Sequence, residues 1–259
     1  MNLHEKNKYA IMKIMELLEN ERIDDLEFNN LKIIQNKNGF CFGIDSVLLS
    51  DYAKNLKKQS KVVDIGTGTG IIGILLCAKS RLKTITGIEI QEEVAKMAEK
   101  SIKLNNLQEQ FNILNINIKE VFNYLEPNTI DCIVTNPPYI KLNTGARNIE
   151  NSKFISRHEA ECNLEDIIKI SYKLLKSNGE FYMIHRTERL ADIMYLLRKY
   201  RLEAKQMRFV QSKQNLSPNL ILLKSIKNGG NSVKIDKPLI IYNEDGTYTE
   251  EVKKIYNKR

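Results

Sequence analysis

Short apolar runs alternate along this chain with longer segments in which apolar residues recur every three or four positions. The runs have the length of buried strands and lie at residues 61–65, 83–90, 111–118 and 130–135. Helical spacing is clearest where Val94, Met97, Ala98 and Ile102 precede Asn105-Asn106. Strands that alternate with helices predict an α/β domain, with a mainly parallel sheet and helices on both faces.

The second half of the chain continues this pattern. Asn163 is placed to cap a helix, and Asn178-Gly179 has the composition of a helix end. A strand at 181–184, a helix at 189–200 and two closing strands at 204–210 and 219–224 are then expected.

The N-terminal part carries weaker signals. The spacing of Ile11, Ile14, Met15 and Leu18 predicts a helix over residues 4–20. Weak alternation over 27–35 predicts a small hairpin with the stretch after Asn38-Gly39. A helix follows, with Asp45 or Ser46 as its N-cap.

Loop-forming residues at 226–235 separate the closing strands from a C-terminal segment with a short helix near 249–257. We therefore expect an N-terminal extension (1–38), a main domain (39–227) and an appendage packed on the same domain (228–259).

The tetrapeptide Asn136-Pro137-Pro138-Tyr139 directly follows the apolar run 130–135. Proline ends the strand and stiffens the backbone at its carboxyl end, where open α/β sheets bind ligands. The Asn136 side-chain carbonyl and the Pro137 backbone carbonyl can accept both hydrogens of one planar NH2 group, and Tyr139 offers a face for stacking. This predicts a site that activates an aryl or amide nitrogen by positioning; the alternative is a plain structural turn.

A second motif, Gly66-Thr67-Gly68-Thr69-Gly70, joins the strand 61–65 to a helix. It lacks the GK[ST] of a phosphate loop, and Asp64 before it would repel a pyrophosphate but suits a cationic amine. Glu89 ends the next strand and is placed to accept two ribose hydroxyls. A nucleoside with a cationic tail satisfies both carboxylates, which predicts S-adenosylmethionine as the cofactor. Asn117 is a candidate contact for its adenine, or a turn residue.

Composition narrows the class of protein. With 42% hydrophobic and 28% charged residues the chain is typical of a globular protein. The four cysteines are far apart and form no CxxC pair or Cys/His cluster, so we expect no metal site and a reducing, cytoplasmic location. No apolar run approaches the ~18 residues of a membrane span, and the N-terminus has no signal-peptide pattern.

The formal net charge is +8. Residues 1–60 hold nine basic and nine acidic side chains, whereas residues 198–227 hold eight basic side chains and one acidic one, Glu203. A bias of composition alone would spread the excess evenly, so the local excess favours a basic face for nucleic acid. The polar stretch 141–162 is longer than ordinary βα loops and is expected to bind substrate.

Together these residues resemble the Rossmann-like S-adenosylmethionine-dependent methyltransferases with an NPPY motif. The chain is most similar to the bacterial tRNA adenine-N6 methyltransferases that modify adenine-37 of a valine tRNA. The resemblance runs from about Arg22 to the tail, and its segments are 22–26, 42–49, 64–70, 136–139, 157–159 and 242–248.

The resemblance implies a seven-stranded sheet with a reversed final hairpin. It implies catalytic roles for Asn136, Pro137 and Tyr139. The cofactor-binding residues it implies are Asp45, Asp64, Gly66, Gly68, Gly70, Glu89 and Asn117. Relatives often have Asp where Asn117 stands, which is a departure from the family pattern. The expected contacts with tRNA are Arg157 and His158 in the loop, and Arg198, Lys199 and Arg201 in the basic stretch.

Other functions stay open on the residues alone. The glutamine methyltransferases that act on release factors use the same two acceptors, but they share a sizeable N-terminal helical domain, whereas only 63 residues precede Asp64 here. A DNA adenine methyltransferase and a catalytically silent RNA-binding protein are further alternatives. We expect a monomer that needs no membrane and no metal.

Overall fold

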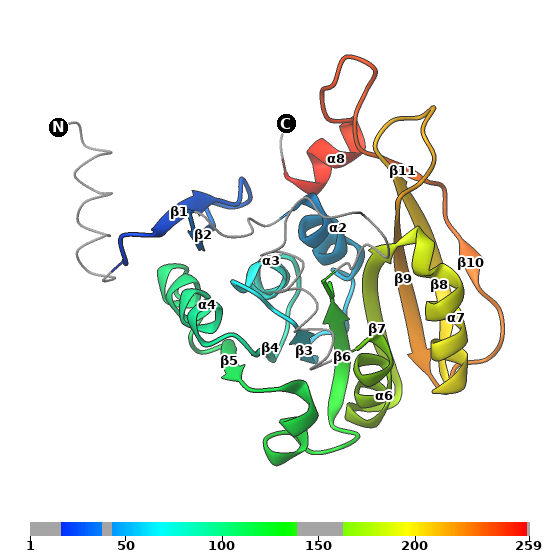
Figure 1. Ribbon diagram of the computed structural model, residues 1–259, viewed down its shortest axis with the longest axis horizontal. Coiled ribbons are helices and arrows are strands. Elements are labelled where there is room, and N and C mark those ends of the chain that lie inside the picture. The colour runs from blue at the N-terminus through cyan, green and yellow to red at the C-terminus, as the bar shows by residue number, and fades with distance from the viewer. Residues whose placement is uncertain (1–16, 38–42, 139–162, 258–259) are drawn as a thin grey trace, which may run out of the picture.

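The structure, a computed structural model, describes residues 17–37, 43–138 and 163–257. Within these ranges a central sheet has nine strands in the order β10-β8-β9-β7-β6-β3-β4-β5, with β11 also beside β8 (Figure 1). The seven long strands are β3 (Lys61–Ile65), β4 (Thr84–Glu89), β5 (Phe111–Asn115), β6 (Ile130–Thr135), β7 (Leu175–Arg186), β8 (Leu202–Gln211) and β9 (Leu220–Lys227). Strand β9 runs antiparallel to both β7 and β8, which confirms the reversed hairpin.

Strand order reverses between β3 and β6. After β3 the chain builds β4 and β5 on one side, and then returns to place β6 on the other side, parallel to β3. Such a switch point leaves a crevice at the carboxyl ends of the two strands, where open α/β sheets bind ligands. Ile65 of β3 is paired with Thr135 of β6. The residues that follow these two positions therefore lie beside one another at the same edge of the sheet.

Helices cover both faces of the sheet, as the sequence predicts (Figure 1). The helices are α2 (Ile44–Tyr52), α3 (Ile71–Lys79), α4 (Glu92–Leu104), α6 (Leu164–Leu174), α7 (Leu190–Lys199) and α8 (Glu250–Ile255), with 3-10 turns η1 (Ile118–Asn123) and η2 (Thr187–Arg189). Strand alternation divides the core: Val62 packs with residues of α2 and α3, whereas its neighbour Val63 packs with residues of α6 and α7.

The N-terminal hairpin differs from the prediction. Strand β1 (Glu21–Asp25) pairs antiparallel with β2 (Lys32–Asn36), so the partner lies before the segment 27–35 and not after Asn38-Gly39. Asn29 and Asn30 adopt positive φ angles of 50° and 56° in the connection. Asn tolerates this left-handed region. The turn of the hairpin is therefore at Asn29-Asn30, whereas the sequence analysis expects it at Asn38-Gly39. Most of the predicted helix 4–20 lies outside the described residues.

Two helix ends also differ. Helix α2 has Gly43 at its N-cap position, so Asp45 and Ser46 lie in its first turn and do not cap it. Helix α6 has the predicted Asn163 cap as a full capping box, but it ends at Leu174 instead of Asn178-Gly179. Asn178, with φ of 60°, lies in an irregular part of β7, where the register with β6 shifts. The turn composition therefore marks an irregular segment inside β7 and not a helix end.

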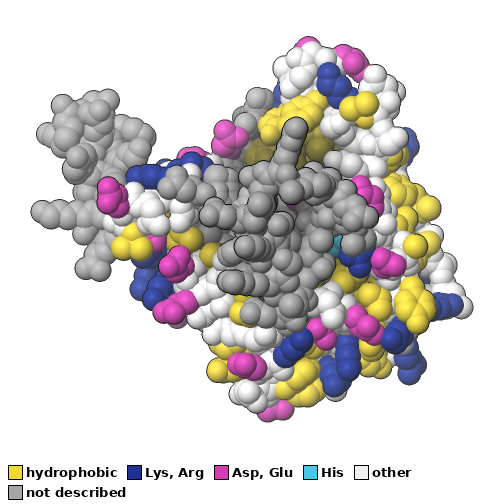
Figure 2. All heavy atoms as spheres, viewed as in Figure 1, with side chains coloured by type: hydrophobic (Ala, Val, Ile, Leu, Met, Phe, Trp, Pro, Cys, Tyr) yellow, Lys and Arg dark blue, Asp and Glu magenta, His cyan; other side chains and the backbone are white. Residues whose placement is uncertain are grey.

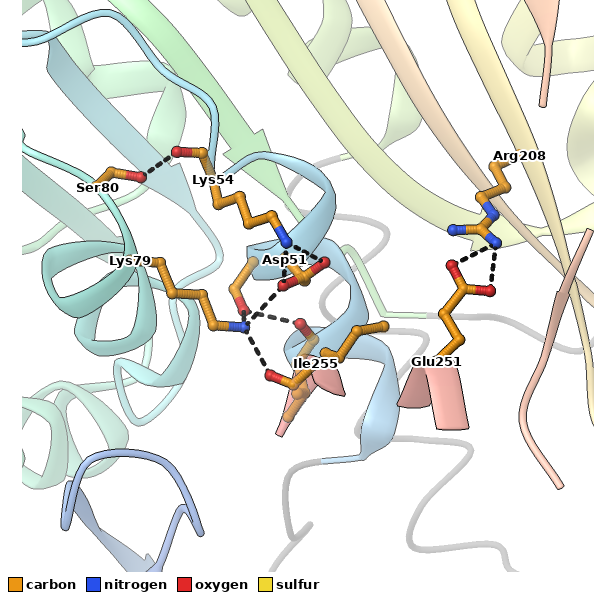
Figure 3. A network of polar contacts seen from close by, with 9 residues as sticks. Asp51, Lys54, Lys79, Ser80, Arg208, Glu251 and Ile255 are labelled. Carbon is orange, nitrogen blue, oxygen red and sulfur yellow. Dashed lines mark hydrogen bonds and ion pairs between the residues drawn. The ribbon is translucent and has the colours of Figure 1, made fainter. Parts of the chain in front are cut away.

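The C-terminal segment joins the sheet edge. Strands β10 (Lys234–Ile235) and β11 (Leu239–Ile240) each pair parallel with β8, which adds two short strands to the seven expected. Helix α8 lies against α2 and α3, where Lys79 extends between Asp51 of α2 and the Ile255 carbonyl of α8 (Figure 3). Within the described ranges, no helix is long and apolar enough to cross a membrane.

Candidate active site

The glycine turn after β3 is held by hydrogen bonds to β4 and to Asp64. Gly66 and Thr67 donate their backbone N–H groups to the Ile88 carbonyl of β4 at 2.9 and 3.0 Å. The Thr67 hydroxyl donates to Asp64 Oδ2 at 2.7 Å. Gly66 and Gly68 have φ angles of 69° and 58°, which residues with a Cβ rarely adopt. The sequence Asp-x-GxGxG therefore encodes a backbone that bends sharply at the carboxyl end of a buried strand.

Asp64 is fully buried within this turn. Its Oδ2 is engaged by Thr67, but Oδ1 has no hydrogen-bond partner among the described residues. Burial raises the pKa of the Asp64 carboxyl to about 7; the Thr67 hydroxyl and the Gly73 backbone N–H oppose the rise, and the nearby Glu89 carboxylate adds to it. A carboxyl group in this state is poised to become charged when a cation approaches.

Glu89 lies at the end of β4, beside the same turn. Its Oε2 accepts from the Gly68 N–H at 3.0 Å and its Oε1 accepts from the Gln91 N–H at 3.0 Å. Glu89 is 6% exposed. These bonds fix the carboxylate at the sheet edge, and ionised carboxylate oxygens are acceptors suited to hydroxyl donors.

Asn117 has a structural task. It is the N-cap of η1, and its Oδ1 accepts from the Lys119 N–H at 3.0 Å. This matches the turn interpretation of the residue. The carboxamide nitrogen has no partner among the described residues, so an adenine contact through that nitrogen stays a prediction.

Asn136 follows β6 and faces the glycine turn across the switch point. The Thr135 hydroxyl donates to the Ile65 carbonyl at 3.0 Å, which ties the two strand ends together. The Asn136 side chain donates from Nδ2 to Ser46 Oγ in the first turn of α2 at 3.2 Å. Pro137 is buried, and Pro138 is exposed. The strand thus ends in a rigid segment whose amide is anchored on a second element.

The structure brings together most of the predicted site. The ends of β3, β4 and β6 carry Asp64, Glu89 and Asn136 to one edge of the sheet, and Asp45 lies in the first turn of α2 next to Ser46. Tyr139, Arg157 and His158 lie outside the described residues.

Arg198, Lys199 and Arg201 lie elsewhere. They flank the start of β8, and Leu202 pairs with Lys227 near the amino ends of the parallel strands. Strand spacing places this edge roughly 20 Å from Asn136. Arg198 forms an ion pair with Glu203, and Lys199 forms one with Glu165.

Two residues of the site were missed from sequence. Thr67 and Ser46 orient Asp64 and Asn136 through their hydroxyls, and Ser46 had been considered only as a helix cap. Nothing in the sequence signals a bond between residues 90 positions apart. His185 is buried at the carboxyl end of β7, and its Nδ1 accepts from the Arg186 N–H at 2.8 Å. Burial and Arg189 lower the pKa of His185 to about 4, so it is neutral at pH 7.

These residues fit S-adenosylmethionine. A Cβ added at Gly66 or Gly68 would meet no atom within 4 Å, so a ligand can approach the backbone there. The buried Asp64 carboxyl favours a neighbouring cationic amine, and Glu89 can accept ribose hydroxyls. No group of His, Cys, Asp and Glu that could hold a metal ion is present in the part of the chain that the structure describes.

Comparison with known proteins agrees with this geometry. Residues 30–210 match the family model described as methyltransferase small domain. The chain belongs to this family. A protein of Bacteroides thetaiotaomicron named tRNA1(Val) (adenine(37)-N6)-methyltransferase is 25% identical over 230 residues, which cover 88% of this chain and 94% of the relative. A Porphyromonas gingivalis protein of the same name is 28% identical, covering 77% and 79%.

Solved structures show the same fold. A predicted O-methyltransferase from Agrobacterium tumefaciens superposes with a TM-score of 0.67 at 19% identity, covering 82% of this chain and 95% of that one. The M. jannaschii protein TYW2, solved in complex with AdoMet, gives 0.54 at 14% identity, with coverages of 81% and 86%. The chain therefore has the fold of class I S-adenosylmethionine-dependent methyltransferases, as predicted.

Proposed function

We propose that this protein transfers a methyl group from S-adenosylmethionine to the exocyclic N6 of an adenine in a tRNA anticodon loop, at adenine-37 of a valine tRNA. The observation that carries the proposal is the junction of β3 and β6, which places the glycine turn with Asp64 beside the Asn136-Pro137 acceptors. The names of the relatives supply the substrate, since the acceptors alone suit any planar NH2 group.

The cofactor contributes an electrophilic methyl group to this site. Asp64 favours its cationic amine electrostatically, while Glu89 accepts from its ribose hydroxyls. The glycine turn lets the backbone approach it closely.

Asn136 Oδ1 and the Pro137 carbonyl accept the two N6 hydrogens, and Tyr139 stacks on the base. An adenine amine is a poor nucleophile because its lone pair is delocalised into the ring. Two acceptors that hold its hydrogens favour a tetrahedral nitrogen whose lone pair is available. The N6 proton is released after transfer, and no strongly basic side chain is required.

The base must leave its stack to reach this edge, which an unpaired anticodon loop permits. We infer that the loop 141–162, with Arg157 and His158, contacts the anticodon loop. We infer that the basic stretch with Arg198, Lys199 and Arg201 contacts the stem of the tRNA, because it lies far from Asn136. We also propose that the enzyme is a monomer and acts in the cytoplasm.

The test is to incubate the protein and labelled cofactor with total tRNA, with duplex DNA and with a release factor, and to identify the methylated product by mass spectrometry. N6-methyladenosine in the tRNA supports the proposal. Methylglutamine in the release factor with unmodified tRNA contradicts it and identifies a glutamine methyltransferase. N6-methyladenine confined to the DNA also contradicts it.

A further inference from the structure

The Asn136 carboxamide has two chemically different ends of nearly equal size. Its carbonyl oxygen can accept a hydrogen from the target amine, whereas its NH2 group would oppose that amine donor to donor. Rotation of the amide by 180° exchanges the two ends without changing its shape. A site that depends on this carbonyl therefore needs a partner that fixes which end faces the substrate.

Ser46 occupies the position of such a partner. Its Oγ accepts from Asn136 Nδ2 at 3.2 Å, across 90 residues of sequence. Ser46 is 6% exposed and lies in the first turn of α2, whose residues from Ser46 to Ser50 are all buried. The acceptor therefore sits on a packed helix, while the backbone of Asn136 is fixed by Pro137 and by the Thr135–Ile65 bond.

We propose that Ser46 is a positioning residue, whose hydroxyl oxygen holds the NH2 end of Asn136 so that its Oδ1 faces the target amine. This inference rests on the proposed function. Ser46 itself does not touch the reacting atoms. Its contribution is the orientation of the carbonyl in the transition state, so its loss lowers the rate of methyl transfer more than the binding of either substrate.

Ser50 provides a matched control on the same helix, one turn further on. It is fully buried, donates to the Val47 carbonyl at 2.7 Å and accepts from Lys79 at 3.3 Å. These two bonds join Ser50 to Val47 and Lys79, and neither of them involves Asn136. A purely structural role of a buried serine in α2 would affect both positions alike.

The experiment compares Ser46→Ala, Ser46→Cys and Ser50→Ala with the wild type in single-turnover methylation of tRNA. The expected result is a loss of about five- to tenfold in the rate for both Ser46 variants, because the cysteine fills the same space but accepts hydrogen bonds weakly. KM for tRNA, cofactor affinity and thermal midpoint stay within about twofold or a few degrees of the wild type. Ser50→Ala is expected to retain the wild-type rate.

A double-mutant cycle with Asn136→Ala completes the test. Ser46→Ala should cost nothing further once the Asn136 amide is gone. A wild-type rate in Ser46→Ala, or full additivity with Asn136→Ala, would overturn the role of Ser46 while wild-type tRNA methylation upholds the proposed function. Absence of N6-methyladenosine with the wild-type protein in the same assay would overturn both.

Discussion

Two charged regions of this molecule differ in what surrounds their charges. At the switch point, Asp64 is buried with one carboxylate oxygen lacking a partner among the described residues, and Glu89 is held by backbone N–H groups. In the stretch 198–227, carboxylates pair with Arg198, Lys199, Arg208 and Lys224. The first region holds buried carboxylates at the ends of two strands, whereas four of the eight basic side chains of the second region are paired with carboxylates within the chain.

The pairing in the second region is spread over several elements. Arg208 of β8 binds Glu251 of α8 (Figure 3), and Lys224 of β9 binds Glu180 of β7. Lys227 is buried and donates to the Leu175 carbonyl at the end of α6 at 2.7 Å. Figure 2 shows Lys and Arg side chains interspersed with Asp and Glu over the part of the surface formed by α6 and α7. Local basic excess in a sequence is therefore a weak measure of a basic surface.

The largest effect is expected at Asn136. Asn136→Ala removes one preorganised acceptor from the target amine and should lower the rate of methyl transfer by ~10²–10³. Calorimetric binding of S-adenosylmethionine should stay unchanged, because none of the proposed cofactor contacts lies on β6 or in the segment that follows it. Asn112→Ala is the control, since Asn112 is an exposed residue of β5 that accepts from the Thr86 hydroxyl. Near-normal turnover by Asn136→Ala would show that the segment 136–139 is a structural turn without a catalytic role.

Glu89→Ala should weaken cofactor binding next. The ribose hydroxyls lose a charged acceptor, which costs on the order of 1.5–3 kcal/mol. Glu89→Gln should lose less, because the amide oxygen still accepts one hydrogen bond. Glu92→Ala is the matched control: this glutamate lies three residues on, is exposed, and pairs with Lys96. Equal cofactor affinity in Glu89→Ala and Glu92→Ala would show that Glu89 does not bind the ribose of the cofactor.

The raised pKa of Asp64 predicts a pH-dependent affinity. With a pKa of about 7 in the free protein, the carboxyl is mostly protonated at pH 6 and mostly ionised at pH 7.5. A cationic amine favours the ionised form, so cofactor affinity should fall about tenfold as the pH drops from 7.5 to 6, with proton release on binding at the lower pH. Calorimetry in two buffers of different ionisation enthalpy measures the cofactor affinity and the number of protons released on binding. Asp64→Asn should bind weakly at both pH values, and an unchanged slope in that variant would assign the dependence to another group.

The sequence predicted the sheet, its helices and the three strand ends of the site, because apolar runs and glycine or proline turns are local signals. It failed where a signal had two local meanings. Asn178-Gly179 marks an irregular segment inside β7, and Asn29-Asn30 marks the hairpin turn that the sequence analysis assigns to Asn38-Gly39. It also missed Ser46 and Thr67, whose roles arise only when distant elements meet. Ion pairs such as Lys199–Glu165 are likewise set by tertiary packing, which charge counting does not see.

The smallest effect is expected on tRNA binding, from substitutions in the basic stretch 198–227. Arg201 is exposed, and its side chain has no ion pair or hydrogen bond among the described residues, whereas Arg198 is paired with Glu203 and also donates to Asn231. If the stem of the tRNA lies on this edge, Arg201→Gln should lower the slope of log affinity against log salt by ~1 and weaken binding a few-fold. Arg198→Gln should change the slope less, because Glu203 already compensates that charge.

Titration of tRNA at several salt concentrations, with the catalytic rate measured at saturating tRNA, separates binding from chemistry. Equal slopes for the wild type and both variants would show that the tRNA does not reach this edge and that the excess charge serves only the fold.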